Sequence, residues 1–181
     1  MRFLAIALFA GGSLSATLLP TFSLEDLVNK SDRIVSGRIV KTWISWDARH
    51  SAIWTRYQLQ VDEVISGLGS KHDEIIVSEP GGTLDGEEMR VADAVRYDVG
   101  DKVILFLRHF STGEWRTVGW SQGKFIIDSA GTIRTAGANG ANVLASPGAG
   151  RGTPLRSLDG LPASQVRQKV RAILAPRGQA K

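Results

Sequence analysis

Residues 53–64 alternate between two kinds of side chain, and this alternation constrains the fold more than any other feature of the sequence. A period of two places the two sets on opposite faces of a β-strand, one buried and one in contact with water. Because one strand cannot bury its apolar face alone, the chain must pair it into a sheet that closes or is covered by a second layer. The expected buried set is Ile53, Thr55, Tyr57, Leu59 and Val61.

Further short segments have the composition of strands and are separated by Gly, Pro, Asp or Ser turns. Gly37, inside the first of them, predicts a bulge or bend of the kind that curls the sheet of a small barrel. Many short strands without alternating helices are typical of sandwiches and small barrels. These segments are 32–41, 74–78, 87–91, 102–109, 115–119, 124–127 and 132–135.

Helical patterns flank this strand region. Ser23 and Asp26 have the spacing of a capping box for a short helix that ends near Lys30. Residues 162–174 have an apolar stripe at helical spacing. Gly, Ala, Ser and Asn dominate the segment before this helix, which indicates a flexible linker or a long loop. We therefore expect a signal peptide at 1–16, a barrel domain at 23–135, a flexible segment at 136–160 and a C-terminal helix at 161–175.

The first residues have the composition of a secretory signal peptide. Met1 and Arg2 give a short positive start, residues 3–10 form an apolar run, and small residues follow it. The run is too short to span a bilayer, which needs about 20 residues, and the pattern is typical of a bacterial-type leader that is removed on export. We expect an exported protein, periplasmic or extracellular, with no integral membrane span after cleavage.

The net charge of +4 comes from the end of the chain. Residues 151–181 contain seven basic side chains and one acidic one, whereas the rest contains 15 basic and 17 acidic side chains. A nucleic-acid-binding domain needs clustered positive charge on its folded surface, so no nucleic-acid partner is expected. The chain has no cysteine, which excludes disulfides and thiolate metal sites.

No catalytic, metal or cofactor site is predicted. The histidines His50, His72 and His109 stand in no pattern typical of a nucleophile–base pair or of a metal-ligand set. Residues 67–71 lack the spacing of a phosphate-binding loop and are interpreted as a turn. The acidic residues between 85 and 93 are interpreted as a solvated loop, with Ca²⁺ binding as the alternative. We therefore expect a protein that is not an enzyme and needs no cofactor.

Clustered tryptophans are the strongest candidates for a binding surface. Tryptophan is enriched in the energetically dominant residues of interfaces, and it also stacks on sugars. The alternative is that these rings cover the end of the core. Gly81 and Gly82 are expected to serve a turn or a close backbone approach, with a ligand-contacting loop as the alternative. The candidate binding residues are Trp43, Trp46, Asp47, His50, Trp54, Gly81 and Gly82.

The order of these motifs resembles a known pattern. It comprises residues 31–39, residues 57–67, Ile75-Ile76-Val77, Pro80-Gly81-Gly82 and the run Val99 to Leu107. The pattern resembles secreted bacterial proteins whose barrel is similar to the netrin-like, OB-type domain of tissue inhibitors of metalloproteinases. The resemblance covers roughly residues 24–127 and implies a small OB-like β-barrel. Those inhibitors act through an N-terminal cysteine, which this chain lacks, so only the barrel and a general role in protein recognition carry over.

The sequence thus predicts a mainly β protein, a small OB-like β-barrel with a short N-terminal helix and a C-terminal helix. The leading hypothesis is an exported, non-enzymatic binding module whose partner is another exported protein, with proteases among the candidates. The first alternative is binding of carbohydrate or a cell-envelope polymer by the same tryptophans. The second is a hydrolase whose site has an unfamiliar arrangement.

Overall fold

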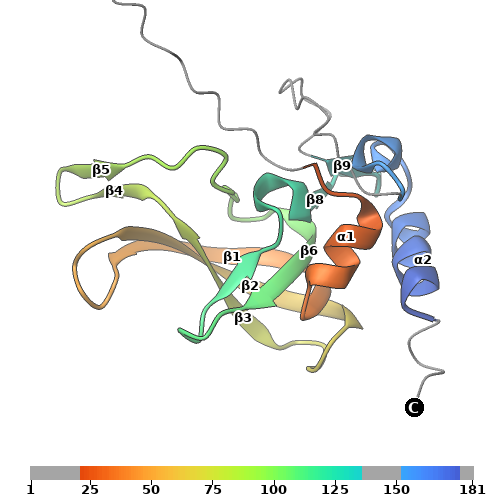
Figure 1. The fold of residues 1–181 in the computed structure, drawn as a ribbon, viewed down its shortest axis with the longest axis horizontal. Coiled ribbons are helices and arrows are strands. Elements are labelled where there is room, and N and C mark those ends of the chain that lie inside the picture. Colours follow the sequence, from red (N-terminus) through yellow and green to blue (C-terminus); the bar gives the residue numbers. More distant parts are fainter. Residues whose placement is uncertain (1–20, 136–151, 176–181) are drawn as a thin grey trace, which may run out of the picture.

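A computed structural model describes residues 21–135 and 152–175 (Figure 1). The predicted signal peptide and residues 136–151 of the predicted flexible segment lie outside the described residues. The elements are α1 (Leu24–Lys30), β1 (Arg33–Trp46), β2 (Ile53–Ser66), β3 (Glu74–Pro80), β4 (Gly82–Leu84), β5 (Glu87–Met89), β6 (Lys102–His109), β7 (Trp115–Thr117), η1 (Trp120–Gly123), β8 (Lys124–Ile127), β9 (Ile133–Thr135), η3 (Leu155–Leu158) and α2 (Ala163–Leu174).

Five strands close into a barrel in the order β1-β2-β3-β7-β6, and β6 pairs back with β1. Strands β3 and β7 run parallel, while the other neighbours in the ring run antiparallel. Strands β8 and β9 extend the sheet from β6, and β4 and β5 form a separate hairpin. The protein is therefore a small OB-like β-barrel with a short N-terminal helix and a C-terminal helix, which confirms the predicted fold class.

Strand β1 bends so that it can pair with β2 along one edge and with β6 along the other. The register between β1 and β2 shifts between Ser36 and Gly37, and again between Ile39 and Lys41. A Cβ atom at position 37 would lie 2.3 Å from the carbonyl oxygen of Gln60, so the close approach of the two strands requires glycine here. The bulge predicted at Gly37 is confirmed.

Strand β6 separates two hydrophobic cores. Its successive residues point alternately into the barrel and away from it, which explains why the run from Val103 to Leu107 is apolar throughout. The inner core fills the barrel and comprises Val35, Ile39, Tyr57, Leu59, Val61, Ile75, Val77, Val95, Tyr97, Val103, Leu105 and Leu107. The outer core comprises Leu24, Leu27, Val28, Ile34, Ile104, Phe106, Val118, Phe125, Ile133, Leu155, Leu158, Ala163, Val166 and Val170.

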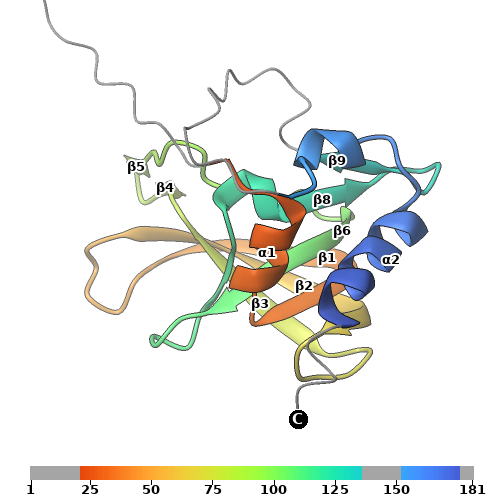
Figure 2. The ribbon, with the colours of Figure 1, turned by 45° about the vertical axis from the view of Figure 1, so that its right-hand side comes forward.

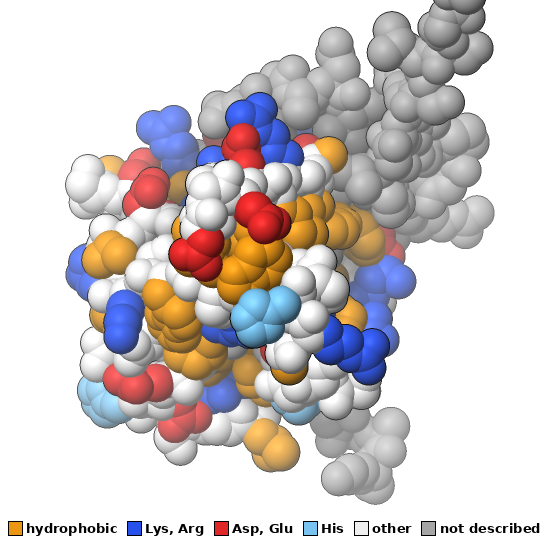
Figure 3. Space-filling view, turned by 90° about the vertical axis from the view of Figure 1, so that its left-hand side faces the viewer, with side chains coloured by type: hydrophobic (Ala, Val, Ile, Leu, Met, Phe, Trp, Pro, Cys, Tyr) orange, Lys and Arg blue, Asp and Glu red, His pale blue; other side chains and the backbone are white. Residues whose placement is uncertain are grey.

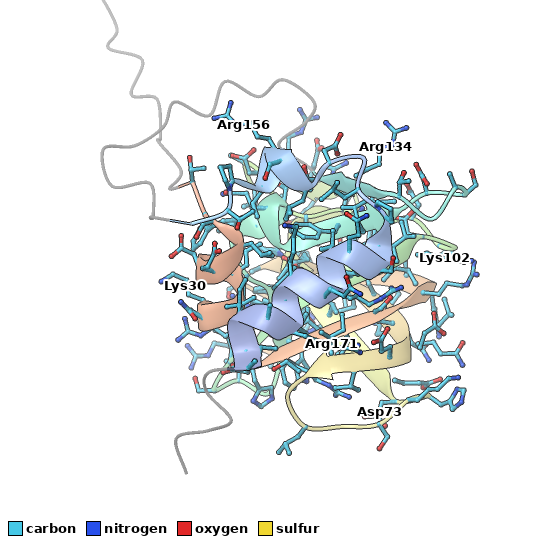
Figure 4. All side chains as sticks on the ribbon, turned by 90° about the vertical axis from the view of Figure 1, so that its right-hand side faces the viewer. Lys30, Asp73, Lys102, Arg134, Arg156 and Arg171 are labelled. Carbon is cyan, nitrogen blue, oxygen red and sulfur yellow. The ribbon has the colours of Figure 1, made fainter. Side chains whose placement is uncertain are left out.

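The helices cover the outer core. Figure 2 shows α1 and α2 on the same side of the barrel, next to β8, β9 and β6. Helix α1 begins with the predicted capping box: the Asp26 amide donates to Ser23 Oγ, and the Ser23 amide donates to the Asp26 carboxylate. Helix α2 lies across the barrel, where Arg171 donates to Glu63 of β2 at 2.5 Å (Figure 4). The C-terminal helix is therefore packed on the barrel domain.

Three local features differ from the sequence-based expectations. Strand β1 continues to Trp46, well past residue 41, because its far half pairs with β2 in a long projecting arm. Residues 82–84 form strand β4, paired with β5, where only a break was expected. Within the predicted flexible segment, Leu155 and Leu158 are buried in the outer core, so the last part of that segment is packed. No helix among the described residues is long and apolar enough to cross a membrane.

Candidate functional site at the end of β3

A buried carboxylate marks the end of strand β3. Ile75, Val77 and Glu79 occupy alternate positions and face the barrel interior, and Glu79 is 3% exposed. The backbone amide of Thr117 on β7 donates to Glu79 Oε1 at 3.0 Å. Burial raises the pKa of Glu79 to about 7, against the opposing influence of the Thr117 hydrogen bonds and of the Arg116 charge. This carboxyl group therefore titrates near neutral pH.

Two tyrosines extend this polar group into the inner core. The hydroxyl groups of Tyr97 and Thr117 share a hydrogen bond, and the rings of Tyr57 and Tyr97 meet edge to face at 4.7 Å between centroids. Burial raises the pKa of Tyr97 well above its usual value, and the nearby Glu79 acts in the same direction. The barrel interior thus ends in a hydrogen-bonded set that includes titratable groups. Burying such groups costs free energy, and apolar side chains would fill the same space without that cost.

A cavity of about 290 Å³, here called the hairpin cavity, lies on one side of Glu79. It lies between the projecting arm of β1 and β2, the β4–β5 hairpin and residues 91–96. Gly81 and Gly82, at φ of +108° and +141°, allow β4 to pass close over the arm. A Cβ atom on Gly82 would lie 3.0 Å from Thr55 Oγ1 and 3.2 Å from Ile44. These glycines therefore serve the turn and close approach that the sequence indicates.

A second cavity, of about 320 Å³ and here called the aromatic cavity, lies on the other side of Glu79. Pro80 and Glu79 line both cavities. The volume lies within the range of small-molecule sites. Three aromatic and three basic side chains dominate its lining: Phe22, Phe110, Trp120, Lys30, Arg108 and Arg116.

The guanidinium group of Arg116 is held between two aromatic rings. Its Cζ atom lies 4.3 Å from the ring centroid of Trp54 and 4.4 Å from that of Phe110. Its Nη2 atom donates to Glu114 at 3.1 Å, while its buried Nε has no hydrogen-bond partner among the described residues. Stacking of this kind fixes the plane of the guanidinium group. One rigid arginine therefore connects the tryptophan of the arm with the aromatic cavity.

Trp120 enters the aromatic cavity from a strained backbone. It has φ of +56° and follows Gly119 at +67°. A positive φ is uncommon for a bulky residue, and such conformations cluster at functional sites. A Cβ atom on Gly119 would lie 3.0 Å from Phe22 and 3.3 Å from Leu27, so packing against α1 holds this turn in place. The Trp120 side chain remains 37% exposed.

The structure divides the predicted tryptophan cluster between two faces of the arm. Trp43 lies opposite Arg56 and Trp54 lies opposite Ser45, which places both rings on the outer face, whereas Trp46 lies on the inner face. Lys41 lies over the Trp43 ring at 5.4 Å. The three rings therefore do not form one continuous surface.

The other predicted residues gather around Trp46. Its ring stacks on that of His50 at 6.0 Å between centroids, and its Nε1 donates to Asp85 of the β4–β5 turn at 3.4 Å. Asp47 accepts hydrogen bonds from Ser51 and shapes the turn between β1 and β2. Figure 3 shows hydrophobic side chains gathered at the centre of this end of the barrel, with charged groups around them. Gly81 and Gly82 line the hairpin cavity below it.

Sequence reasoning missed Glu79, Phe110 and Arg116 as parts of the site. One signal was available, because Glu79 has the same strand parity as the buried Ile75 and Val77 and directly precedes Pro80. The arginine stack leaves no such signal, since it joins residues from β2, β7 and the turn after β6.

Comparison with known protein families found none that matches this chain, and comparison with curated proteins also found no match.

Proposed function

We propose that the protein is an exported, non-enzymatic binding module that recognises another exported protein through the surface around the end of β3. The observation that supports this most strongly is the stack of Arg116 between Trp54 and Phe110. Tryptophan and arginine are the residue types most enriched among the few that dominate binding energy. Rings that are already fixed lose little conformational entropy on association, which favours affinity.

The position of the stack also favours a protein partner. The half-buried Trp54 lies on the arm opposite Pro80, which lines both cavities, and the 36% exposed Phe110 lines the aromatic cavity. Flat aromatic rings next to cavities suit a protein partner that inserts one side chain into a cavity and covers the surrounding surface. Proteases remain among the candidate partners because of the sequence resemblance, which implies recognition of proteins in general.

Carbohydrate binding is less favoured by the same rings. Sugar rings stack on the free face of an aromatic side chain, and one face of Trp54 is covered by Arg116 and one face of Trp43 by Lys41. Trp46 is stacked with His50. Each of these contacts competes with a sugar for the aromatic surface, so we favour a protein ligand.

The proposal is tested by capture from the exported fraction of the producing organism on immobilised protein that begins at residue 17. The test variant is the double substitution Trp54→Ala and Phe110→Ala, and the control is Leu68→Ala. Leu68 is 92% exposed in the turn between β2 and β3, away from the arm (Figure 1). We expect a captured protein whose affinity, measured afterwards with purified partner, falls at least about tenfold in the double variant only.

Two results would contradict the proposal. Equal affinity of the wild type and the double variant would place the interface elsewhere on the molecule. Capture of no protein, combined with retention on glycan or peptidoglycan columns that the double variant loses, would replace it with polymer binding.

A further inference from the structure

We infer that the aromatic cavity is a binding site for a carboxylate attached to an aromatic or similarly flat apolar group. This inference names a ligand chemistry for one part of the proposed surface, and it rests on the proposed function only where the carboxylate belongs to a polypeptide. The same chemistry has two sources, a free aromatic acid or the C-terminus of a chain that ends in an aromatic residue.

Two arginines that line the aromatic cavity lie opposite each other on neighbouring strands. Arg108 of β6 and Arg116 of β7 are directly opposite partners in the antiparallel ladder, and both line the aromatic cavity. Both guanidinium groups also lie over the ring of Phe110, at 5.9 Å and 4.4 Å from its centroid. Like charges opposite each other on neighbouring strands repel. A bound anion between them would turn this repulsion into attraction.

Two acidic side chains lie near these arginines and compensate part of the positive charge. Glu79 lines the same cavity and interacts electrostatically with Arg116. Glu114 pairs with Arg116 at 3.1 Å but is shared with Arg56 at 3.4 Å. Within residues 21–135 and 152–175, neither Arg108 nor Lys30 forms an ion pair, although Lys30 acts on the Asp26 carboxyl at longer range. The lining of the cavity thus includes two cationic side chains, Arg108 and Lys30, that lie over aromatic rings and form no ion pair within residues 21–135 and 152–175.

The remaining walls favour a flat apolar group next to the anion. Phe22, Phe110 and Trp120 supply ring surface on the same cavity, together with Pro80 and Val118. The strained backbone that holds Trp120 in the lining is maintained by packing on α1, so this wall is formed before any ligand binds. Arginine donates paired hydrogen bonds to a carboxylate, and an apolar ligand without a carboxylate has no atoms to accept them.

The test measures binding to the full mature chain by calorimetry, supported by NMR shifts of the tryptophan indoles. The free-acid probes are 3-phenylpropionate and its amide, and the polypeptide probes are N-acetyl-Gly-Phe with a free or an amidated C-terminus. Acetate serves as the probe without a ring. We expect the acid to bind at least about tenfold more tightly than the matching amide, since each hydrogen bond to a charged group contributes that much, and acetate to bind more weakly than 3-phenylpropionate.

Matched variants locate the site. Arg108→Gln should weaken the acid about tenfold and leave the amide unchanged, whereas Lys102→Gln, on the same strand but on the side away from Lys30 in Figure 4, should change neither. Trp120→Gly should weaken both probes while the fold is retained, because glycine adopts a positive φ without strain.

The pair of probes also identifies the source of the carboxylate. Tighter binding of the peptide acid supports a polypeptide C-terminus, and tighter binding of 3-phenylpropionate supports a free acid. Equal binding of acid and amide, or no effect of Arg108→Gln, would overturn the inference. Either of those results together with successful protein capture would leave the proposed function standing, and the two failures are therefore distinguishable.

Discussion

The two hydrophobic cores on either side of β6 differ in what they bury. The outer core, which α1, η3 and α2 cover, borders only uncharged buried polar side chains among the described residues, such as Ser36 opposite Ile104 and Thr135 opposite Phe125. The inner core ends in Glu79, Thr117 and the two tyrosines Tyr57 and Tyr97. Apolar packing contributes to stability wherever it occurs, whereas a buried carboxyl group lowers stability when it is ionised. This difference is the one expected if the outer core serves the fold and the end of the inner core serves the proposed binding.

The largest expected effect comes from breaking the outer core. Phe106 is fully buried and meets Phe125 edge to face at 5.2 Å between centroids. Phe106→Ala should lower the free energy of unfolding by about 3–5 kcal/mol, because it removes a large apolar side chain and leaves a cavity. Urea unfolding followed by circular dichroism measures this. Lys102→Ala on the same strand is the control and should change stability by less than about 0.5 kcal/mol.

The second prediction concerns the buried carboxyl group of the inner core. The folded pKa of Glu79 is raised to about 7, whereas the unfolded value is near 4.5. The folded state therefore holds its proton more tightly, so stability contributed by this group is present below pH 4.5 and is lost as the pH rises to 7 and above. The loss amounts to about 3 kcal/mol.

Comparison with Glu79→Gln isolates this contribution from all other titrating groups. The unfolding free energy of the wild type, relative to this variant, should fall by about 3 kcal/mol between pH 4.5 and pH 8. Glu88→Gln is the matched control, because Glu88 is an exposed carboxylate on the lining of the hairpin cavity. A wild type and Glu79→Gln variant with parallel pH profiles would mean that this carboxyl group titrates normally.

The strands, the two helices and the barrel were predictable because their signals are local. The period-two alternation of residues 53–64 depends on nothing beyond the strand itself, and the capping box of α1 spans four consecutive positions. The bulge at Gly37 was readable for the same reason. Small barrels occur in proteins of many functions. The role in protein recognition that the resemblance to netrin-like inhibitors implies therefore stays a prediction.

The surface around the end of β3 was harder to predict because it depends on register between distant strands. Trp43, Trp46 and Trp54 are close in sequence, but strand parity divides them between two faces once β1 continues to Trp46. The partners of Arg116 come from other strands and turns, and nothing in the sequence around β7 indicates them. Local pattern thus locates the strands, while the site depends on how the barrel closes.

A smaller effect is expected at the start of α1, which closes one side of the outer core. Ser23 Oγ accepts a hydrogen bond from the amide of Asp26 at 3.1 Å. Ser23→Ala removes this cap and should lower the unfolding free energy by about 1 kcal/mol. Ser23→Asn, which can cap in the same way, should retain most of the stability in the same thermal unfolding measurement. A loss with alanine that asparagine does not recover would point to packing of the serine and not to capping.

The smallest expected effect has the opposite sign and lies at the aromatic cavity. Arg108 is opposite Arg116 on neighbouring strands, and no ion pair of the described residues involves Arg108. Arg108→Gln should therefore raise the unfolding free energy at low salt by about 0.5 kcal/mol, while Arg108→Lys should leave it unchanged. At 1 M salt, where the Debye length is about 3 Å, the repulsion is screened and the gain in unfolding free energy should disappear. A loss of stability at every salt concentration would show that Arg108 stabilises the fold through its contact with Phe110. A gain confined to low salt would show that the fold keeps an unfavourable charge next to the aromatic cavity, as expected if a bound anion compensates it.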